Sequence, residues 1–66
     1  MKIFLNGEPV DPGGARTVDE LIRRHRLPPA TTLVEWNGTA LHRRDWPSQP
    51  LQESDRIEIM QVAAGG

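Results

Sequence analysis

Cysteine is absent from the 66-residue sequence, so neither a disulfide nor a thiolate metal site stabilises the fold. The only two histidines, His25 and His42, do not have the spacing of a pair of metal ligands. A domain of this size buries only about 60% of the surface that its unfolded chain exposes, which leaves little room for a deep catalytic pocket. We therefore predict one small domain that is not an enzyme, holds no metal and keeps no permanently bound cofactor.

An excess of charge of either sign is also missing. Eight Lys and Arg residues stand against nine Asp and Glu residues, and the formal net charge is −1. This balance provides no long-range attraction for nucleic acid or for an anionic membrane. No apolar run approaches the roughly 20 residues of a membrane span, and the N-terminal residues lack the apolar core of a signal peptide. We expect a soluble cytoplasmic protein that is monomeric when free.

The sequence does contain a clear order of strand and helix signals. Asn6-Gly7 predicts a hairpin over roughly residues 2–18, because both residues tolerate the positive φ of a type I′ turn. A helix follows, in which Thr17 and Glu20 have the spacing of a capping box. Pro28-Pro29 ends this helix, which is short and must be stabilised by packing against a sheet.

Further strands complete the pattern after the helix. We expect a strand at residues 32–38, a brief strand at 39–44, an irregular connection at 45–55 and a final strand at 56–62. This order predicts an α+β protein of the β-grasp type, with one main helix packed across a mixed four- to five-stranded sheet. The last strand should run parallel beside the first. The β-grasp domain would cover residues 1–62, and residues 63–66 would form a flexible tail.

Two basic clusters, at residues 23–26 and 42–46, have an ordinary structural interpretation. The first suits the C-terminal end of the helix, where the helix dipole favours cations. No aromatic-rich surface accompanies either cluster, so nucleic-acid binding is not expected. His25 lies beside the apolar stripe of the helix and is expected to be half-buried packing, because no nucleophile or carboxylate is placed to work with it.

The remaining candidates are read as structural residues as well. Trp36 is expected in the core and Trp46 over its edge. The carboxylates of Asp45, Glu53 and Asp55 fall in a turn-rich stretch and are expected to be solvated.

The last residues of the sequence are the strongest candidate for chemistry. Gly65-Gly66 follow a strand-like run and Ala63-Ala64. Glycine has no Cβ, so a Gly-Gly end can enter a narrow channel and deliver its carboxylate to the active site of another protein. A carboxylate becomes reactive when its oxygen is made a leaving group, as in adenylation by ATP. The chain could thus act as a covalent carrier without catalytic residues of its own.

These features together resemble the ThiS family, the ubiquitin-like sulfur carriers of thiamine biosynthesis. The resemblance covers nearly the whole chain, from "KIFLNGE" through "TVDELI" and "WNG" to the terminal "QVAAGG". Arg43 and Trp46 stand at the family's spacing from the terminal glycine. One departure is Ser54, where the family usually has glycine.

The resemblance implies a mechanism and a set of partners. An adenylyltransferase similar to ubiquitin-activating enzymes would use ATP and magnesium to adenylate the carboxylate of Gly66. Sulfur from a cysteine desulfurase or another sulfurtransferase would displace AMP and leave a thiocarboxylate. Thiazole synthase would then use that sulfur for the thiazole ring of thiamine.

Strand alternation also indicates a partner surface. If Ile57 and Ile59 face the helix, then Phe4, Met60 and Val62 face outward on neighbouring strands and form one exposed apolar patch beside the tail.

Other interpretations of the tail remain open. The small subunit of molybdopterin synthase shares the expected fold and the Gly-Gly end, and a ubiquitin-like protein modifier is a further variant. In a different class, the domain would be a noncovalent adaptor whose glycines have no role.

Overall fold

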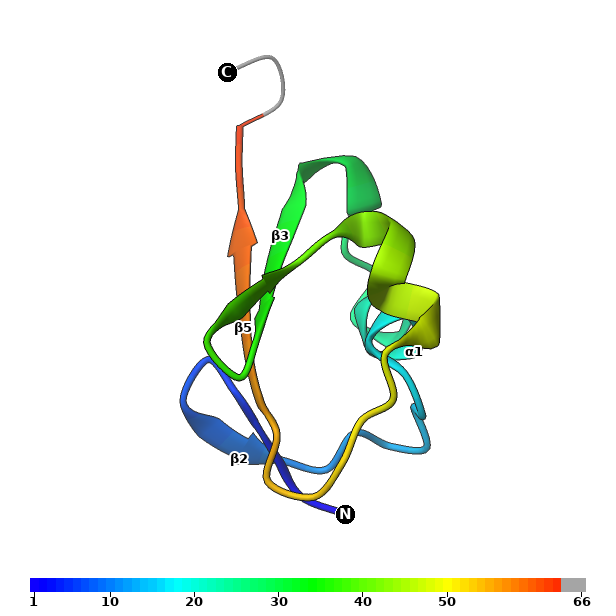
Figure 1. Ribbon diagram of the computed structural model, residues 1–66, viewed down its shortest axis with the longest axis vertical. Coiled ribbons are helices and arrows are strands. Elements are labelled where there is room, and N and C mark those ends of the chain that lie inside the picture. The colour runs from blue at the N-terminus through cyan, green and yellow to red at the C-terminus, as the bar shows by residue number, and fades with distance from the viewer. Residues whose placement is uncertain (64–66) are drawn as a thin grey trace.

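The computed structural model describes residues 1–63. It contains five strands, one α-helix and two 3-10 helices (Figure 1). In chain order these are β1 (Ile3–Leu5), β2 (Glu8–Val10), α1 (Val18–Arg24), η1 (Pro29–Thr31), β3 (Thr32–Trp36), β4 (Thr39–Leu41), η2 (Arg43–Ser48) and β5 (Arg56–Gln61). None of the helices within residues 1–63 has the length and apolarity to cross a lipid bilayer.

The five strands form one mixed sheet in the order β2-β1-β5-β3-β4. β5 pairs parallel with β1 and antiparallel with β3, and the two outer pairs are antiparallel hairpins. The predicted neighbourhood of the first and last strands is therefore confirmed. Figure 1 shows α1 and η2 on one side of this sheet, which leaves the opposite face uncovered by helices.

Both hairpins turn at an Asn-Gly pair. Asn6 and Gly7 have φ values of 51° and 84°, and Asn37 and Gly38 have 50° and 84°. These positive angles match the right-handed twist of the flanking strands. The turn prediction at residues 6–7 is confirmed.

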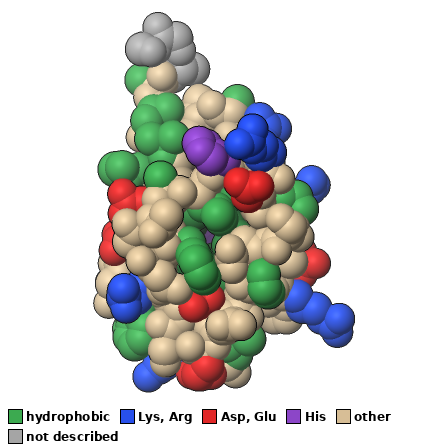
Figure 2. Space-filling model, viewed as in Figure 1, with side chains coloured by type: hydrophobic (Ala, Val, Ile, Leu, Met, Phe, Trp, Pro, Cys, Tyr) green, Lys and Arg blue, Asp and Glu red, His purple; other side chains and the backbone are tan. Residues whose placement is uncertain are grey.

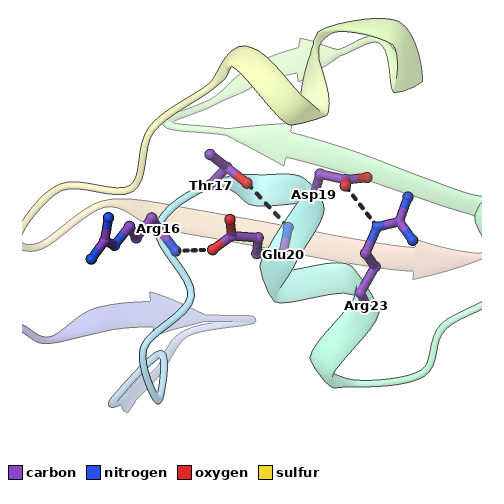
Figure 3. A network of polar contacts seen from close by, with 5 residues as sticks. All are labelled: Arg16, Thr17, Asp19, Glu20 and Arg23. Carbon is purple, nitrogen blue, oxygen red and sulfur yellow. Dashed lines mark hydrogen bonds and ion pairs between the residues drawn. The ribbon is translucent and has the colours of Figure 1, made fainter.

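The start of α1 is capped much as its sequence predicts. The Thr17 hydroxyl accepts a hydrogen bond from the backbone N–H of Glu20 at 3.2 Å. The Glu20 carboxylate reaches back to the N–H of Arg16 at 2.7 Å, one residue before the cap (Figure 3). Helix α1 thus begins with two of its local donors satisfied.

The core lies between α1, η2 and the sheet. Its buried apolar residues are Ile3, Ala15, Val18, Leu21, Ile22, Val34, Trp46, Leu51 and Ile57. The expected roles of the two tryptophans were wrong. Trp46 is only 2% exposed and its indole N–H donates to the carbonyl of Leu41, whereas Trp36 is half-buried at the margin. The reason is η2, a helical turn in the predicted irregular segment that folds Trp46 under the sheet.

Asp55 also differs from the expectation of a solvated turn residue, because it is 6% exposed. Its carboxylate accepts hydrogen bonds from the Trp36 indole, the Asn37 side-chain amide and the backbone N–H of Gln52, at 3.2, 3.1 and 2.8 Å. Because this single carboxylate accepts from all three donors, Asp55 joins the β3–β4 turn to the start of β5.

His25 was expected to be half-buried and is exposed. The helix ends at Arg24, so His25 is its C-cap and lies beyond the helical residues that carry the buried stripe of Val18, Leu21 and Ile22.

Candidate functional site

The candidate site is the point where the chain leaves the sheet. β5 ends at Gln61, and the backbone N–H of Val62 donates to the carbonyl of Thr31 at 2.8 Å. Ala63 is exposed and belongs to no strand. The predicted carrier residues Ala64, Gly65 and Gly66 lie outside the described residues.

A side-chain clamp holds this exit point, and sequence reasoning missed it. The Gln61 amide donates to the Thr32 hydroxyl at 2.9 Å, and its oxygen accepts from the Thr31 hydroxyl at 3.3 Å. Thr32 is itself buried and donates to the carbonyl of Pro28 at 2.6 Å. The clamp ties the last residue of β5 to the start of β3. One sequence signal could have indicated the clamp: Gln61 is a polar residue at a position that strand alternation places on the inward-facing side of β5.

The uncovered face of the sheet carries an apolar patch next to the exit point. Met60 and Val62 are 57% and 45% exposed, and Leu33, directly opposite Met60 in the β3–β5 register, is 50% exposed. We call these three residues the outer-face patch. Figure 2 shows hydrophobic side chains gathered at the upper left, along the side where β5 ends. Leu33 was not predicted for this patch, although its alternation with the buried Val34 indicates the outward direction.

Phe4 lies apart from the outer-face patch. It is half-buried and pairs with Arg56, which stands four residues before Met60 on β5. The ammonium group of Lys2 lies 5.2 Å from the centre of its ring, within the range of a cation–π contact. Phe4 therefore extends the same sheet face at the other end of β5.

Two glutamates border the outer-face patch. Glu35 and Glu58 are exposed and stand directly opposite each other in the β3–β5 register. Like charges in this arrangement repel, so the pair carries a local cost. Together with Leu33, Ala40 and Met60 they line part of a hollow of about 610 Å³. A partner that contacts the apolar patch with a nearby cation would remove this repulsion.

Within residues 1–63, no group of three or more His, Asp or Glu residues is placed to hold a metal ion.

The fold and the exit point define the structural class of this protein. A mixed five-stranded sheet crossed by one main helix, with the last strand central and parallel to the first, is a β-grasp-like fold. The chain matches the model of the ThiS family over residues 2–66, and it belongs to that family. The resemblance drawn from the sequence is thereby confirmed.

Solved structures agree with this assignment. The crystal structure of the thiamine biosynthesis protein ThiS from Geobacter metallireducens is similar to this chain with a TM-score of 0.80 and 29% identity, and each chain covers 100% of the other. The solution structure of a thiamine biosynthesis protein from the same organism gives a TM-score of 0.78, with 88% of that chain covered.

A curated relative is much longer. A thiazole synthase from Magnetococcus marinus is 35% identical over 66 residues, which make up all of this chain and 20% of the relative. The chain thus spans about a fifth of the length of that relative.

Proposed function

We propose that this protein is a sulfur carrier for thiamine biosynthesis whose reacting group is the carboxylate of Gly66. The observation that carries the proposal is the ThiS family match, which runs from residue 2 through the terminal glycine. The clamped exit point supports it, because a carrier needs its tail to leave a rigid domain in a defined direction. The match to this family favours the thiamine branch over the small subunit of molybdopterin synthase.

The chemistry takes place in partner proteins. An adenylyltransferase would join the Gly66 carboxylate to AMP from ATP, with magnesium, and pyrophosphate would leave. A persulfide on a cysteine desulfurase or another sulfurtransferase would then form the C–S bond while AMP leaves, and a thiol would cleave the resulting acyl disulfide, forming a disulfide and releasing the thiocarboxylate. The resulting thiocarboxylate would pass its sulfur to thiazole synthase. The chain supplies the acyl group and presents it to the partner enzymes, and it contributes no acid or base of its own.

The outer-face patch would be the docking surface for these partners. Exposed apolar groups next to the exit point favour burial against another protein. Phe4, which the sequence predicts in one patch with Met60 and Val62 beside the tail, would contribute to the same interface from the far end of β5.

Mass spectrometry tests the proposal directly. The full chain is incubated with ATP, magnesium, the adenylyltransferase and a sulfur donor. The expected result is the exchange of one oxygen for one sulfur at Gly66, located by fragmentation of the C-terminal peptide. An unchanged mass after complete turnover of ATP would contradict the proposal.

A chain extended by one residue beyond Gly66 is the matched control. A carrier loses sulfur loading, because the glycine carboxylate is then an amide. A noncovalent adaptor would bind its partners as before, and this result would favour the adaptor interpretation.

A further inference from the structure

The two basic clusters of the sequence meet in one groove. A hollow of about 900 Å³ lies between the C-terminal half of α1 and η2. Its charged lining consists of Asp19 and four arginines: Arg23, Arg26, Arg43 and Arg44. The rest of its lining is apolar: Ile22, Leu27, Pro29 and Pro47. We call this hollow the arginine groove.

Most of the positive charge in the arginine groove has no local partner. Asp19 accepts a hydrogen bond from Arg23 at 2.8 Å, and this carboxylate raises the pKa of the Arg23 guanidinium (Figure 3). Among residues 1–63, no ion pair involves Arg26, Arg43 or Arg44. The groove is therefore strongly positive in a chain whose net charge is −1.

Helix electrostatics does not account for the arginines of η2. Cations near the C-terminal end of α1 are favoured by the dipole, which explains Arg23. Arg43 and Arg44 stand in the first turn of η2, the end at which a helix dipole disfavours cations. These two side chains add positive charge where the local structure gains nothing from it.

Arg26 has a strained backbone conformation. Its φ is +55°, the left-handed conformation that follows a helix end and that glycine usually fills. A residue with a Cβ loses about 1–2 kcal/mol there. An arginine is thus held at the edge of the arginine groove against the backbone preference.

The groove and the exit point lie at the same end of the molecule. Pro29 and Arg43 line both the arginine groove and the hollow of about 610 Å³ that Leu33 and Met60 also line. Pro29 also begins η1, whose last residue, Thr31, accepts the hydrogen bond from Val62. A protein that surrounds the tail would therefore meet the glutamate pair on one side and the arginine groove on the other.

We propose that the arginine groove binds an acidic segment of the protein that adenylates the tail. The inference rests on the proposed carrier function. Arginines select carboxylates, and the apolar lining suits a segment that also carries aliphatic side chains. No exposed tryptophan or tyrosine borders the groove, so it lacks the stacking surface that single-stranded nucleic acid uses. Opposite charges on the two sides of the tail fix one docking orientation.

The test measures association of the full chain with the adenylyltransferase at low and high salt. Arg43→Glu combined with Arg44→Glu should slow association by about tenfold or more at low salt, and by less at high salt. Arg16→Glu is the matched control. It reverses an exposed charge before the N-terminal end of α1, where Figure 3 shows Arg16 well away from Arg23, and should have little effect.

Arg26→Gly separates binding from stability. It should raise the urea midpoint of unfolding, because glycine relieves the left-handed strain, and it should weaken binding to the enzyme severalfold. A purely structural role predicts no loss of affinity in this more stable variant.

The outcomes distinguish the inference from the carrier proposal. Equal association rates for the double variant and Arg16→Glu would overturn the groove inference, while sulfur loading of the parent chain would leave the carrier proposal intact. Binding of a single-stranded oligonucleotide that the double charge reversal abolishes would also overturn it, in favour of a nucleic-acid site.

Discussion

At the scale of single residues, Ser54 stands in a backbone conformation that another residue type would adopt more easily. Its φ is +69°, in the region that favours glycine. Its backbone N–H donates to the carbonyl of Lys2 at 2.7 Å, which ties the turn to the start of β1. The turn is therefore kept in a conformation that serine does not prefer.

Ser54→Gly should increase the free energy of unfolding by up to about 1 kcal/mol, since relief of the left-handed strain exceeds the added entropy of the unfolded chain. Urea denaturation measures the change. Ser48→Gly, at a residue without positive φ, should lower stability instead. Equal effects of the two substitutions would contradict the role assigned to Ser54.

Single residues were also where sequence reasoning failed. The burial of Trp46 depends on η2 packing against α1, and the burial of Asp55 depends on the β3–β4 turn lying against the start of β5. Neither relationship has a local sequence signal, because both join segments that are distant along the chain.

At the scale of elements, β5 combines three tasks. It is the central strand that joins the two hairpins, its buried Ile57 belongs to the core, and its last residues form the clamp. The alternation of "RIEIMQV" predicted the core and outer faces of this strand correctly. The clamp could not be predicted from the sequence alone, because Thr31 and Thr32 lie about thirty positions earlier in the chain than Gln61.

Gln61→Ala should leave the fold nearly as stable, with a loss of about 1 kcal/mol or less for partly exposed hydrogen bonds. We expect a severalfold higher KM for the chain in the pyrophosphate-release assay of the adenylyltransferase, because the tail leaves the sheet in a less defined direction. Gln52→Ala, at an exposed glutamine in the turn before β5, is the control. Identical kinetics for both variants would remove the clamp from the mechanism.

At the scale of the whole molecule, the local signals were sufficient for the architecture. The Asn-Gly turns, the capping box and the alternating last strand each specify a local structure, and only a few chain paths connect them. The distribution of charge was not predictable in the same way. The arginine groove brings Arg23 and Arg26 together with residues 43–44, which the sequence presents as two unrelated clusters.

Met60→Asp should weaken binding to the adenylyltransferase at least tenfold without unfolding the domain, because Met60 is exposed and central to the outer-face patch. Calorimetry measures the affinity. Thr39→Asp adds the same charge at the exposed end of β4 that pairs with Trp36, at the opposite end of β3 from the exit point. Similar affinities for both variants would exclude the outer-face patch from the interface.

The backbone hydrogen bond from Val62 to Thr31 marks the point where the chain leaves the sheet. Covalent geometry lets the four residues 63–66 span at most about 14 Å. In the proposed carrier, any enzyme that modifies Gly66 must hold its reacting atoms within that radius of Val62. Partner enzymes with different chemistries must then all obey the same upper limit on one distance. That distance runs from the enzyme surface that contacts the sheet to the enzyme's catalytic centre.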